Sequence, residues 1–345
     1  MRSGLERLGL LLQSSTQTIV AGAGTATGQR RLPIADIEQQ FNLPVGKLNR
    51  GAGIESVMHA GEGESEASLG AAACRAAMQA AGVSLEEVDL LVATSETCAG
   101  FPQLGAQVHQ QLNAGEAQGA LDVGGGCMGL VNAFVTAKGL IESGVVRCVL
   151  VVTADVHSRI LTPQQVKGEF GGLFGDGASA FVLRAAEGGT ADGASKAVNG
   201  HYRLGAWLAG GSGAYARAIN VKLGEEGRLS WAFEGEALAR AAVERMEQIV
   251  SDLELRSGTK REDAAAFATH QPNPRLVELL ARQLGVPAGK FPAVARTMGN
   301  LGSSTSGTAL ALALQAQSNV PAEQRGPIFL ASLSPGLLWS GMVLH

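Results

Sequence analysis

Short apolar segments alternate with longer helical patterns along this chain, and that alternation constrains the fold more than any other feature of the sequence. The predicted strands of the first half comprise residues 89–95, 120–125 and 147–154. The predicted helices, whose apolar residues recur every three or four positions, comprise residues 66–83, 102–113 and 128–144. Strands that alternate with helices predict an α/β fold with a layered sheet.

The second half repeats this order. It holds a long amphipathic helix, a short strand, two more helices and a hairpin, predicted over 234–255, 264–270, 273–285, 303–317 and 327–344. In both halves an acidic linker leads into a short strand that ends on a polar residue, which indicates an internal duplication. We therefore predict four parts: an N-terminal extension (1–15), a first half (16–185), a connecting and irregular segment (186–233) and a second half (234–345).

Composition excludes several classes of protein. The 345 residues are 46% hydrophobic and carry a formal net charge of −4, with both signs well mixed, which argues against nucleic acid as a partner. The four cysteines lack metal-ligand spacing, so we expect no metal site, no disulfide framework and a reducing, cytoplasmic setting. No apolar stretch approaches a membrane span, and the apolar run near the N-terminus is too short for a secretion signal.

Cys127 lies in "DVGGGCMGLVNAF", directly after three glycines and before a predicted helix. The glycines permit a sharp turn and leave room for a substrate. Unpaired N–H groups and the helix dipole favour a thiolate at a helix N-terminus, so we expect a lowered pKa and a nucleophilic sulfur. Most cysteines are inert core residues, and this context sets Cys127 apart from Cys74 and Cys148.

Two further residues are candidates for chemistry. His270 ends the predicted strand "AAFAT" and precedes "QPNPR", a position at which α/β sheets present functional side chains. A neutral histidine there would donate a hydrogen bond or move a proton, although a capping role is the commoner one. Asn300 lies in the glycine-flanked turn "TMGNLGSSTSG", where asparagine is also an ordinary turn residue. The other five histidines occupy contexts that require no chemistry.

The order Cys, His, Asn also occurs in papain-like proteases. Cys127 instead lies in the middle of an α/β repeat and lacks the sequence surroundings of a papain-type cysteine, so we set that reading aside.

Taken together, the motifs resemble those of the thiolase-fold condensing enzymes, and among them the β-ketoacyl-acyl-carrier-protein synthase III group. The resemblance covers nearly the whole chain and rests on these stretches: "DVGGGCMGLVNAF", "LFGDGASAFVL", "THQPNPRLVELLARQLGV", "MGNLGSSTSGTALALAL" and "SLSPGLLWSGMVL". It implies a thiolase-like fold in which two pseudo-duplicated βαβαβ halves form five layers, αβαβα.

The resemblance also implies roles for individual residues. Cys127 would carry an acyl group taken from coenzyme A or a carrier protein, while His270 and Asn300 would act on a malonyl thioester. The N–H groups of Cys127 and Gly336 would form an oxyanion hole, and Asn273 and Arg275 would contact the pantetheine arm or the carrier protein. The implied enzyme is a homodimer whose substrates are thioesters and which requires no metal, flavin or nicotinamide.

Two alternatives remain open. In the first, the acyl group on Cys127 passes to an alcohol or amine, with His270 as general base. In the second, the chain is a non-catalytic partner subunit of a heterodimeric synthase, although such a subunit would have no chemical need for Cys127, His270 and Asn300 together.

Overall fold

The computed structural model describes residues 16–166, 168–186, 201–215, 219–223, 229–233 and 235–345. Among these residues, strands from both halves pair edge to edge into one sheet of nine strands, in the order β11-β12-β13-β8-β1-β7-β6-β4-β5. The strands of the first half are β1 (Thr18–Thr27), β4 (Leu90–Thr94), β5 (Gly119–Asp122), β6 (Cys148–Val156) and β7 (Asp176–Ala185). Those of the second half are β8 (Tyr202–Gly211), β11 (Ala266–Thr269), β12 (Ile328–Ser334) and β13 (Leu338–Leu344).

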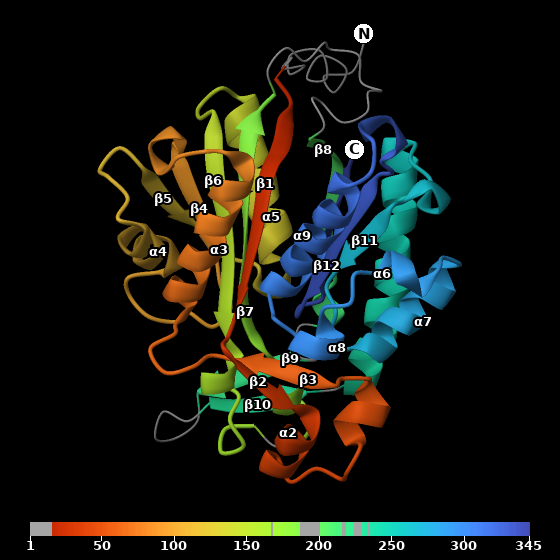
Figure 1. The fold of residues 1–345 in the computed structure, drawn as a ribbon. Coiled ribbons are helices and arrows are strands. Elements are labelled where there is room, and N and C mark those ends of the chain that lie inside the picture. The colour runs from red at the N-terminus through yellow and green to blue at the C-terminus, as the bar shows by residue number, and fades with distance from the viewer. Residues whose placement is uncertain (1–15, 167, 187–200, 216–218, 224–228, 234) are drawn as a thin grey trace.

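Helices and the two parts of this sheet form five layers, as the family resemblance implied (Figure 1). One outer layer consists of α3 (Glu66–Ala81) and α4 (Leu104–Leu112), and the other of α6 (Gly235–Ser257) and α7 (Pro274–Leu284). Between the two parts of the sheet lie α5 (Gly129–Glu142) and α9 (Ser304–Ser318). The largest apolar cluster surrounds this middle layer and joins α5 and α9 to strands of both halves, so the two halves share one core.

The strand order confirms the internal duplication. In the first half β4 runs parallel to β6, and β6 runs antiparallel to β7, which pairs with β1. In the second half β11 runs parallel to β12, and β12 runs antiparallel to β13, which pairs with β8. Each strand of the second half thus has a counterpart in the first, while β5 has no counterpart in the described part of the second half. The loops after β4 and β11 occupy equivalent positions.

The segment 186–233 is more regular than the sequence predicted. Residues 202–211 form β8, an internal strand of the large sheet that pairs with both β1 and β13. Two shorter strands, β9 (Ile219–Leu223) and β10 (Leu229–Phe233), form an antiparallel pair. The strands of this segment were not predicted because the segment is rich in glycine, which usually indicates turns. The predicted extension 1–15 and residues 187–200 of the predicted connecting segment lie outside the described residues, and the domain boundaries stay predictions.

A smaller layer lies beneath the sheet, built mainly by residues that the sequence analysis did not assign (Figure 1). It contains the antiparallel pair β2 (Arg30–Pro33) and β3 (Ser56–His59), helix α2 (Ile34–Gln40) and a π-helical turn at Lys47–Ala52. The short helix α8 (Ala295–Met298) leads into the Asn300 turn.

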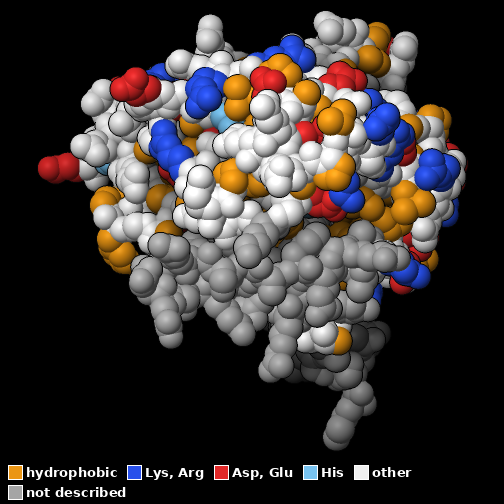
Figure 2. Space-filling model, turned by 90° about the horizontal axis from the view of Figure 1, so that it is seen from below, with side chains coloured by type: hydrophobic (Ala, Val, Ile, Leu, Met, Phe, Trp, Pro, Cys, Tyr) orange, Lys and Arg blue, Asp and Glu red, His pale blue; other side chains and the backbone are white. Residues whose placement is uncertain are grey.

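Charged side chains of both signs are interspersed on the described surface seen from below (Figure 2). Several form ion pairs, among them Lys47 with Glu169 at 2.7 Å and Arg275 with Glu278 at 2.8 Å. Within the described ranges, no helix has both the length and the apolar character that crossing a membrane requires.

Candidate active site

Cys127 lies in the tight turn that the sequence predicted. Gly125 and Gly126 have φ angles of 147° and 54°, which side chains rarely tolerate, and a 3-10 turn at Gly126–Met128 leads directly into α5. The Ser332 hydroxyl on β12 donates a 2.5 Å hydrogen bond to the Cys127 carbonyl. The turn that carries the thiol is therefore fastened to the second half of the molecule.

The Cys127 thiol faces a carboxylate that the sequence analysis did not consider. Its Sγ donates to the Glu96 carboxylate, with Sγ–O distances of 3.5 and 3.6 Å. Burial, followed by the negative charge of Glu96, raises the pKa of the Cys127 thiol well above its ordinary value. The predicted lowering of this pKa is wrong, because burial and the carboxylate outweigh the favourable effect of the helix N-terminus.

His157 holds the Glu96 carboxylate from the other side. Its Nε2 lies 3.5 Å from Glu96 Oε1, and its Nδ1 lies 3.3 Å from the Gly175 carbonyl oxygen. Since both ring nitrogens face acceptors, the ring satisfies both as an imidazolium. Burial disfavours this charge, but the Glu96 carboxylate outweighs burial and raises the pKa of His157. In turn, His157 overcomes the effect of burial on Glu96 and lowers the pKa of that carboxyl.

Asp155, at the end of β6, joins loops from both halves. Its Oδ1 accepts from the Ser95 hydroxyl at 3.1 Å and from the Glu96 N–H at 2.7 Å. Its Oδ2 accepts from the Ser303 N–H at 2.9 Å and from the Ser303 hydroxyl at 2.5 Å. Burial and the nearby Glu96 charge raise the pKa of Asp155 to about 6. This carboxylate therefore fixes the backbone of Glu96 relative to the Asn300 turn.

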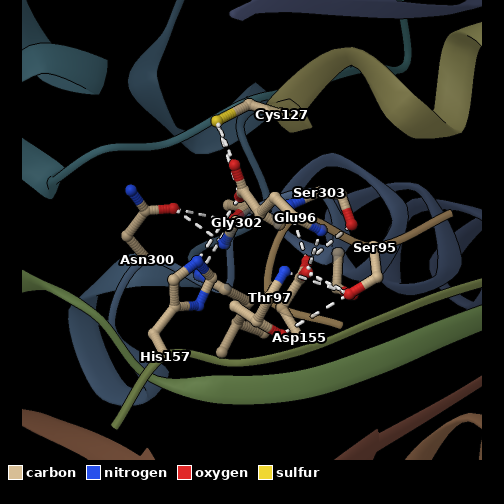
Figure 3. Close-up of polar contacts among 12 residues, drawn as sticks. Ser95, Glu96, Thr97, Cys127, Asp155, His157, Asn300, Gly302 and Ser303 are labelled. Atoms are coloured by element: carbon tan, nitrogen blue, oxygen red, sulfur yellow. Dashed lines mark hydrogen bonds and ion pairs between the residues drawn. The ribbon is translucent and has the colours of Figure 1, made fainter. Parts of the chain in front are cut away.

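Asn300 is buried, and its amide is oriented by two donors. Its Oδ1 accepts from the Gly302 N–H and from the Thr305 hydroxyl, each at 3.0 Å. These bonds assign the oxygen and leave the Nδ2 group as a donor that points away from Gly302 (Figure 3). Such an oriented N–H group is suited to hold a developing negative charge.

His270 directly follows β11, and its backbone N–H donates to the Ala331 carbonyl at 3.0 Å. The residue is half-buried, and its buried Nδ1 atom has no hydrogen-bond partner among the described residues. Burial lowers the pKa of His270 to about 4, so the ring is neutral near pH 7, as predicted.

The structure brings Cys127, His270 and Asn300 together around Glu96 and Gly302. Glu96 contacts the thiol and interacts electrostatically with His270. Gly302 interacts with His270 through its backbone and donates to Asn300. A Cβ atom added to Gly302 would lie 2.0 Å from Glu96 Oε1, so a glycine is needed for this close approach (Figure 3). The arrangement can hold an acylated sulfur facing two neutral donors.

Gly336 lies in the turn between β12 and β13, close to the Cys127 turn. Ser334, just before this turn, packs closely against Gly126: a Cβ atom added to Gly126 would lie 2.7 Å from the Ser334 hydroxyl oxygen. The position of Gly336 fits its predicted place in an oxyanion hole, and this role stays a prediction.

Asn273 and Arg275 lie at the start of α7. The Asn273 side chain caps the helix by accepting from the Leu276 N–H at 3.0 Å, and Arg275 is exposed and paired with Glu278. Their predicted contact with a pantetheine arm or carrier protein also stays a prediction. Within the described ranges, no three His, Cys, Asp or Glu side chains are grouped so that they could hold a metal ion.

Comparison with known proteins identifies the family. A β-ketoacyl-[acyl-carrier-protein] synthase III from Sinorhizobium medicae is 30% identical over 331 residues, which cover 95% of this chain and 99% of the relative. The enzyme of the same name from Roseobacter denitrificans is 31% identical over 339 residues, with the same coverage. The chain belongs to the β-ketoacyl-[acyl-carrier-protein] synthase III family. Models of the synthase III family and of its C-terminal part match residues 121–200 and 255–345, respectively.

Solved synthase III structures confirm the thiolase fold. The 3-oxoacyl-[acyl-carrier-protein] synthase III of Aquifex aeolicus is 25% identical and superposes with a TM-score of 0.83, over 95% of this chain and 99% of its own. The priming β-ketosynthase of the R1128 polyketide pathway is also 25% identical, with a TM-score of 0.83 over 95% of this chain and 96% of its own. The chain therefore has the fold of a condensing enzyme over nearly its full length.

Sequence reasoning missed part of the site of this synthase III family member. Glu96, Asp155 and Ser303 were not considered, and His157, which was predicted to need no chemistry, lies against the Glu96 carboxylate. One signal could have revealed Glu96: it directly follows the predicted strand 89–95, as His270 ends the equivalent strand of the second half. The roles of Asp155 and His157 depend on tertiary contacts that the sequence does not display.

Proposed function

We propose that this chain is a ketosynthase III-type condensing enzyme in which an acyl thioester first acylates Cys127. A malonyl thioester then loses CO2 and attacks the acyl group to give a 3-oxoacyl thioester. The observation that carries the proposal is the placement of the Cys127 thiol near two neutral donors, the oriented Asn300 amide and the uncharged His270 ring. The names of the relatives, which specify β-ketoacyl-[acyl-carrier-protein] synthesis, support the same reaction.

The geometry accounts for the second half-reaction. When the bond to the malonyl carboxylate breaks, its electron pair moves into an enolate whose charge lies on the thioester oxygen. His270 and Asn300 would donate hydrogen bonds to that oxygen, and preorganised donors stabilise such a charge far better than water does. The enolate carbon attacks the acyl carbonyl, the carbon–sulfur bond to Cys127 breaks, and the departing thiolate takes a proton from solvent to restore the thiol.

Coenzyme A and carrier-protein thioesters are proposed as the substrates, without a resident cofactor. The exposed Arg275 at the start of α7 supports a contact with the pantetheine arm or with the carrier protein. The setting proposed is the cytoplasm, and it is supported by four free cysteines, which a reducing compartment would preserve.

A homodimer is proposed from the free edge of the sheet. Among the described strands β5 is the last on its side of the sheet, three of its four residues are exposed, and Leu121 is 39% exposed. Phe101, on the loop between β4 and α4, is 95% exposed. An open strand edge beside exposed apolar side chains favours pairing with a second copy.

Intact-mass measurement tests the function. The protein is incubated with acyl-CoAs of increasing chain length, and one acyl adduct is expected on the wild type and none on Cys127→Ala. Addition of a malonyl thioester should then release CO2. An adduct without CO2 release would favour transfer to an alcohol or amine instead. The absence of an adduct with every acyl-CoA and acyl-carrier protein tested would favour a non-catalytic subunit.

A further inference from the structure

The proton on the Cys127 thiol requires an acceptor during acylation. Attack on a thioester requires the thiolate, yet the raised pKa of the half-buried Cys127 thiol beside Glu96 favours the protonated form. Within the described part of the chain no hydrogen bond joins the Cys127 thiol to His270, and the Asn300 amide is not a base. The hydrogen-bond acceptor for the thiol is the Glu96 carboxylate, at 3.5 and 3.6 Å.

We propose that Glu96 is a further catalytic residue, the general base that takes the thiol proton as Cys127 attacks the acyl thioester. This inference rests on the proposed function. The Sγ–H bond breaks and its proton moves to a Glu96 oxygen while Sγ bonds to the acyl carbon. The bond from that carbon to the thiol carrier then breaks, and the departing sulfur takes the proton from Glu96. Glu96 thereby returns to the carboxylate, and the reaction yields acyl-Cys127 and a free thiol.

The surroundings of Glu96 suit a base held in one position. Its backbone N–H is fixed by Asp155 at 2.7 Å, and its Oε1 is held by His157 at 3.5 Å. Gly302 allows the carboxylate to lie where any larger residue would displace it. The side chain is 21% exposed, so it lies at the border of the accessible space where a thioester would enter. His157 is a positioning residue, because it acts on the thiol only through Glu96.

A purely electrostatic role for Glu96 is the alternative, and glutamine separates the two. Glu96→Gln keeps the size and an acceptor oxygen but removes both the charge and the basicity. If Glu96 only suppresses the thiolate, Glu96→Gln should speed every reaction of Cys127. If Glu96 is the base, Glu96→Gln should slow enzymatic acylation while it eases simple alkylation of the sulfur.

Two rates measured on the full-length protein test the proposal: acylation by acyl-CoA, followed by rapid quench and intact mass, and alkylation by iodoacetamide as a function of pH. For Glu96→Gln we expect acylation to fall by about 10²–10⁴-fold, the usual contribution of a positioned base. The alkylation midpoint should move to lower pH because the negative neighbour is gone. His157, Asp155 and His270 still face the site in this variant, so the shift is read as a difference from the wild type.

Two variants control for disruption of the loop. Glu96→Asp keeps a base and should acylate more slowly than the wild type but faster than Glu96→Gln. Thr97, next to Glu96 on the same loop, donates a 2.8 Å hydrogen bond to the Glu66 carboxylate. The Glu66→Gln variant removes this carboxylate and should be acylated at the wild-type rate.

Several results would overturn the inference. These are wild-type or faster acylation by Glu96→Gln, equal acylation by the Asp and Gln variants, or an equal loss in Glu66→Gln. In each of these cases the wild type still forms its adduct, and the proposed function stands. Failure of the wild type itself to form an adduct would instead count against the proposed function.

Discussion

Asp155 and Ser303, which are 148 positions apart in the sequence, are joined by two hydrogen bonds at the centre of the candidate site. The other oxygen of the same carboxylate holds the loop that carries Glu96. One buried side chain thus sets the distance between the base proposed for the first half-reaction and the Asn300 turn proposed for the second.

Ser303→Ala should destabilise the protein. Its buried hydroxyl donates to a carboxylate, and such bonds contribute about 1.5–3 kcal/mol. Urea denaturation should show a loss of this size in the free energy of unfolding. Ser318→Ala, which removes an exposed hydroxyl bonded to the Gln315 carbonyl, should change it by less than about 0.5 kcal/mol. Equal effects in the two variants would contradict the importance of the Asp155 contact.

His157 and Glu96 should be energetically coupled. His157→Phe preserves the ring contact with Phe174, whose centroid lies 4.5 Å away, but leaves the Glu96 charge without its partner. Loss of stability should therefore be smaller when Glu96 is already glutamine, with a coupling energy of about 0.5–3 kcal/mol. Urea denaturation of the wild type, both single variants and the double variant measures this energy. Strict additivity would show that the pair does not form.

The buried neutral ring of His270 should make the protein less stable in mild acid. Its folded-state pKa of about 4 lies below the ordinary value of 6.5, so the unfolded chain binds the proton more readily. The contribution of His270 to the free energy of unfolding is fully present above pH 6.5 and is lost as pH falls from 6.5 towards 4. Between pH 7 and pH 5 the loss amounts to about 2 kcal/mol.

His270→Asn tests this effect, because it removes the titrating ring and should unfold with less dependence on pH in that range. His157 acts in the opposite sense: its pKa is raised, so its contribution is present below pH 6.5 and is lost as pH rises through its folded-state pKa. The comparison therefore uses the difference between wild type and variant. An identical pH dependence in the two proteins would mean that the His270 ring is not buried and neutral.

Asn300→Asp should separate the two half-reactions. Aspartate keeps an oxygen for the Gly302 N–H and the Thr305 hydroxyl, but it loses the Nδ2 donor. Decarboxylation of a malonyl thioester should fall by about 10²–10³-fold, as on removal of an oxyanion donor. Acylation of Cys127, measured by intact mass, should persist. If the acyl adduct were lost as well, Asn300 would instead be needed for the first step or for folding.

Local pattern predicted much of this fold. Helical spacing and strand alternation correctly located the helices and strands around Cys127 and His270, since these signals lie within a few residues of each other. β8 was not recognised, because its strand character depends on pairing with β1 and β13 and not on its glycine-rich sequence.

The site was also predicted only in part, because the sequence displays local features but not contacts between distant parts of the chain. The glycine turn before Cys127 and the turn at Asn300 are local features, and both are found as expected. The pKa of Cys127 was predicted in the wrong direction because the helix N-terminus is a local effect, whereas burial and Glu96 act from distant parts of the chain. Asp155 has no local signature at all, since its four donors come from two loops in different halves.

The internal duplication gives this protein two copies of one loop, and the copies have diverged in task. After β4 the loop presents Glu96 to the thiol. Gln271 occupies the equivalent position after β11, where it is buried and its side chain hydrogen-bonds to backbone groups of Pro292, Val294 and Ala295. Both loops carry a residue of the candidate site, Glu96 in the first and His270 in the second, and the second also uses Gln271 to anchor itself. A symmetric pair of identical halves would have to compromise between these demands. A single chain with two unequal halves does not, because Glu96 can face the thiol while Gln271, at the equivalent position, holds the loop of His270 in place.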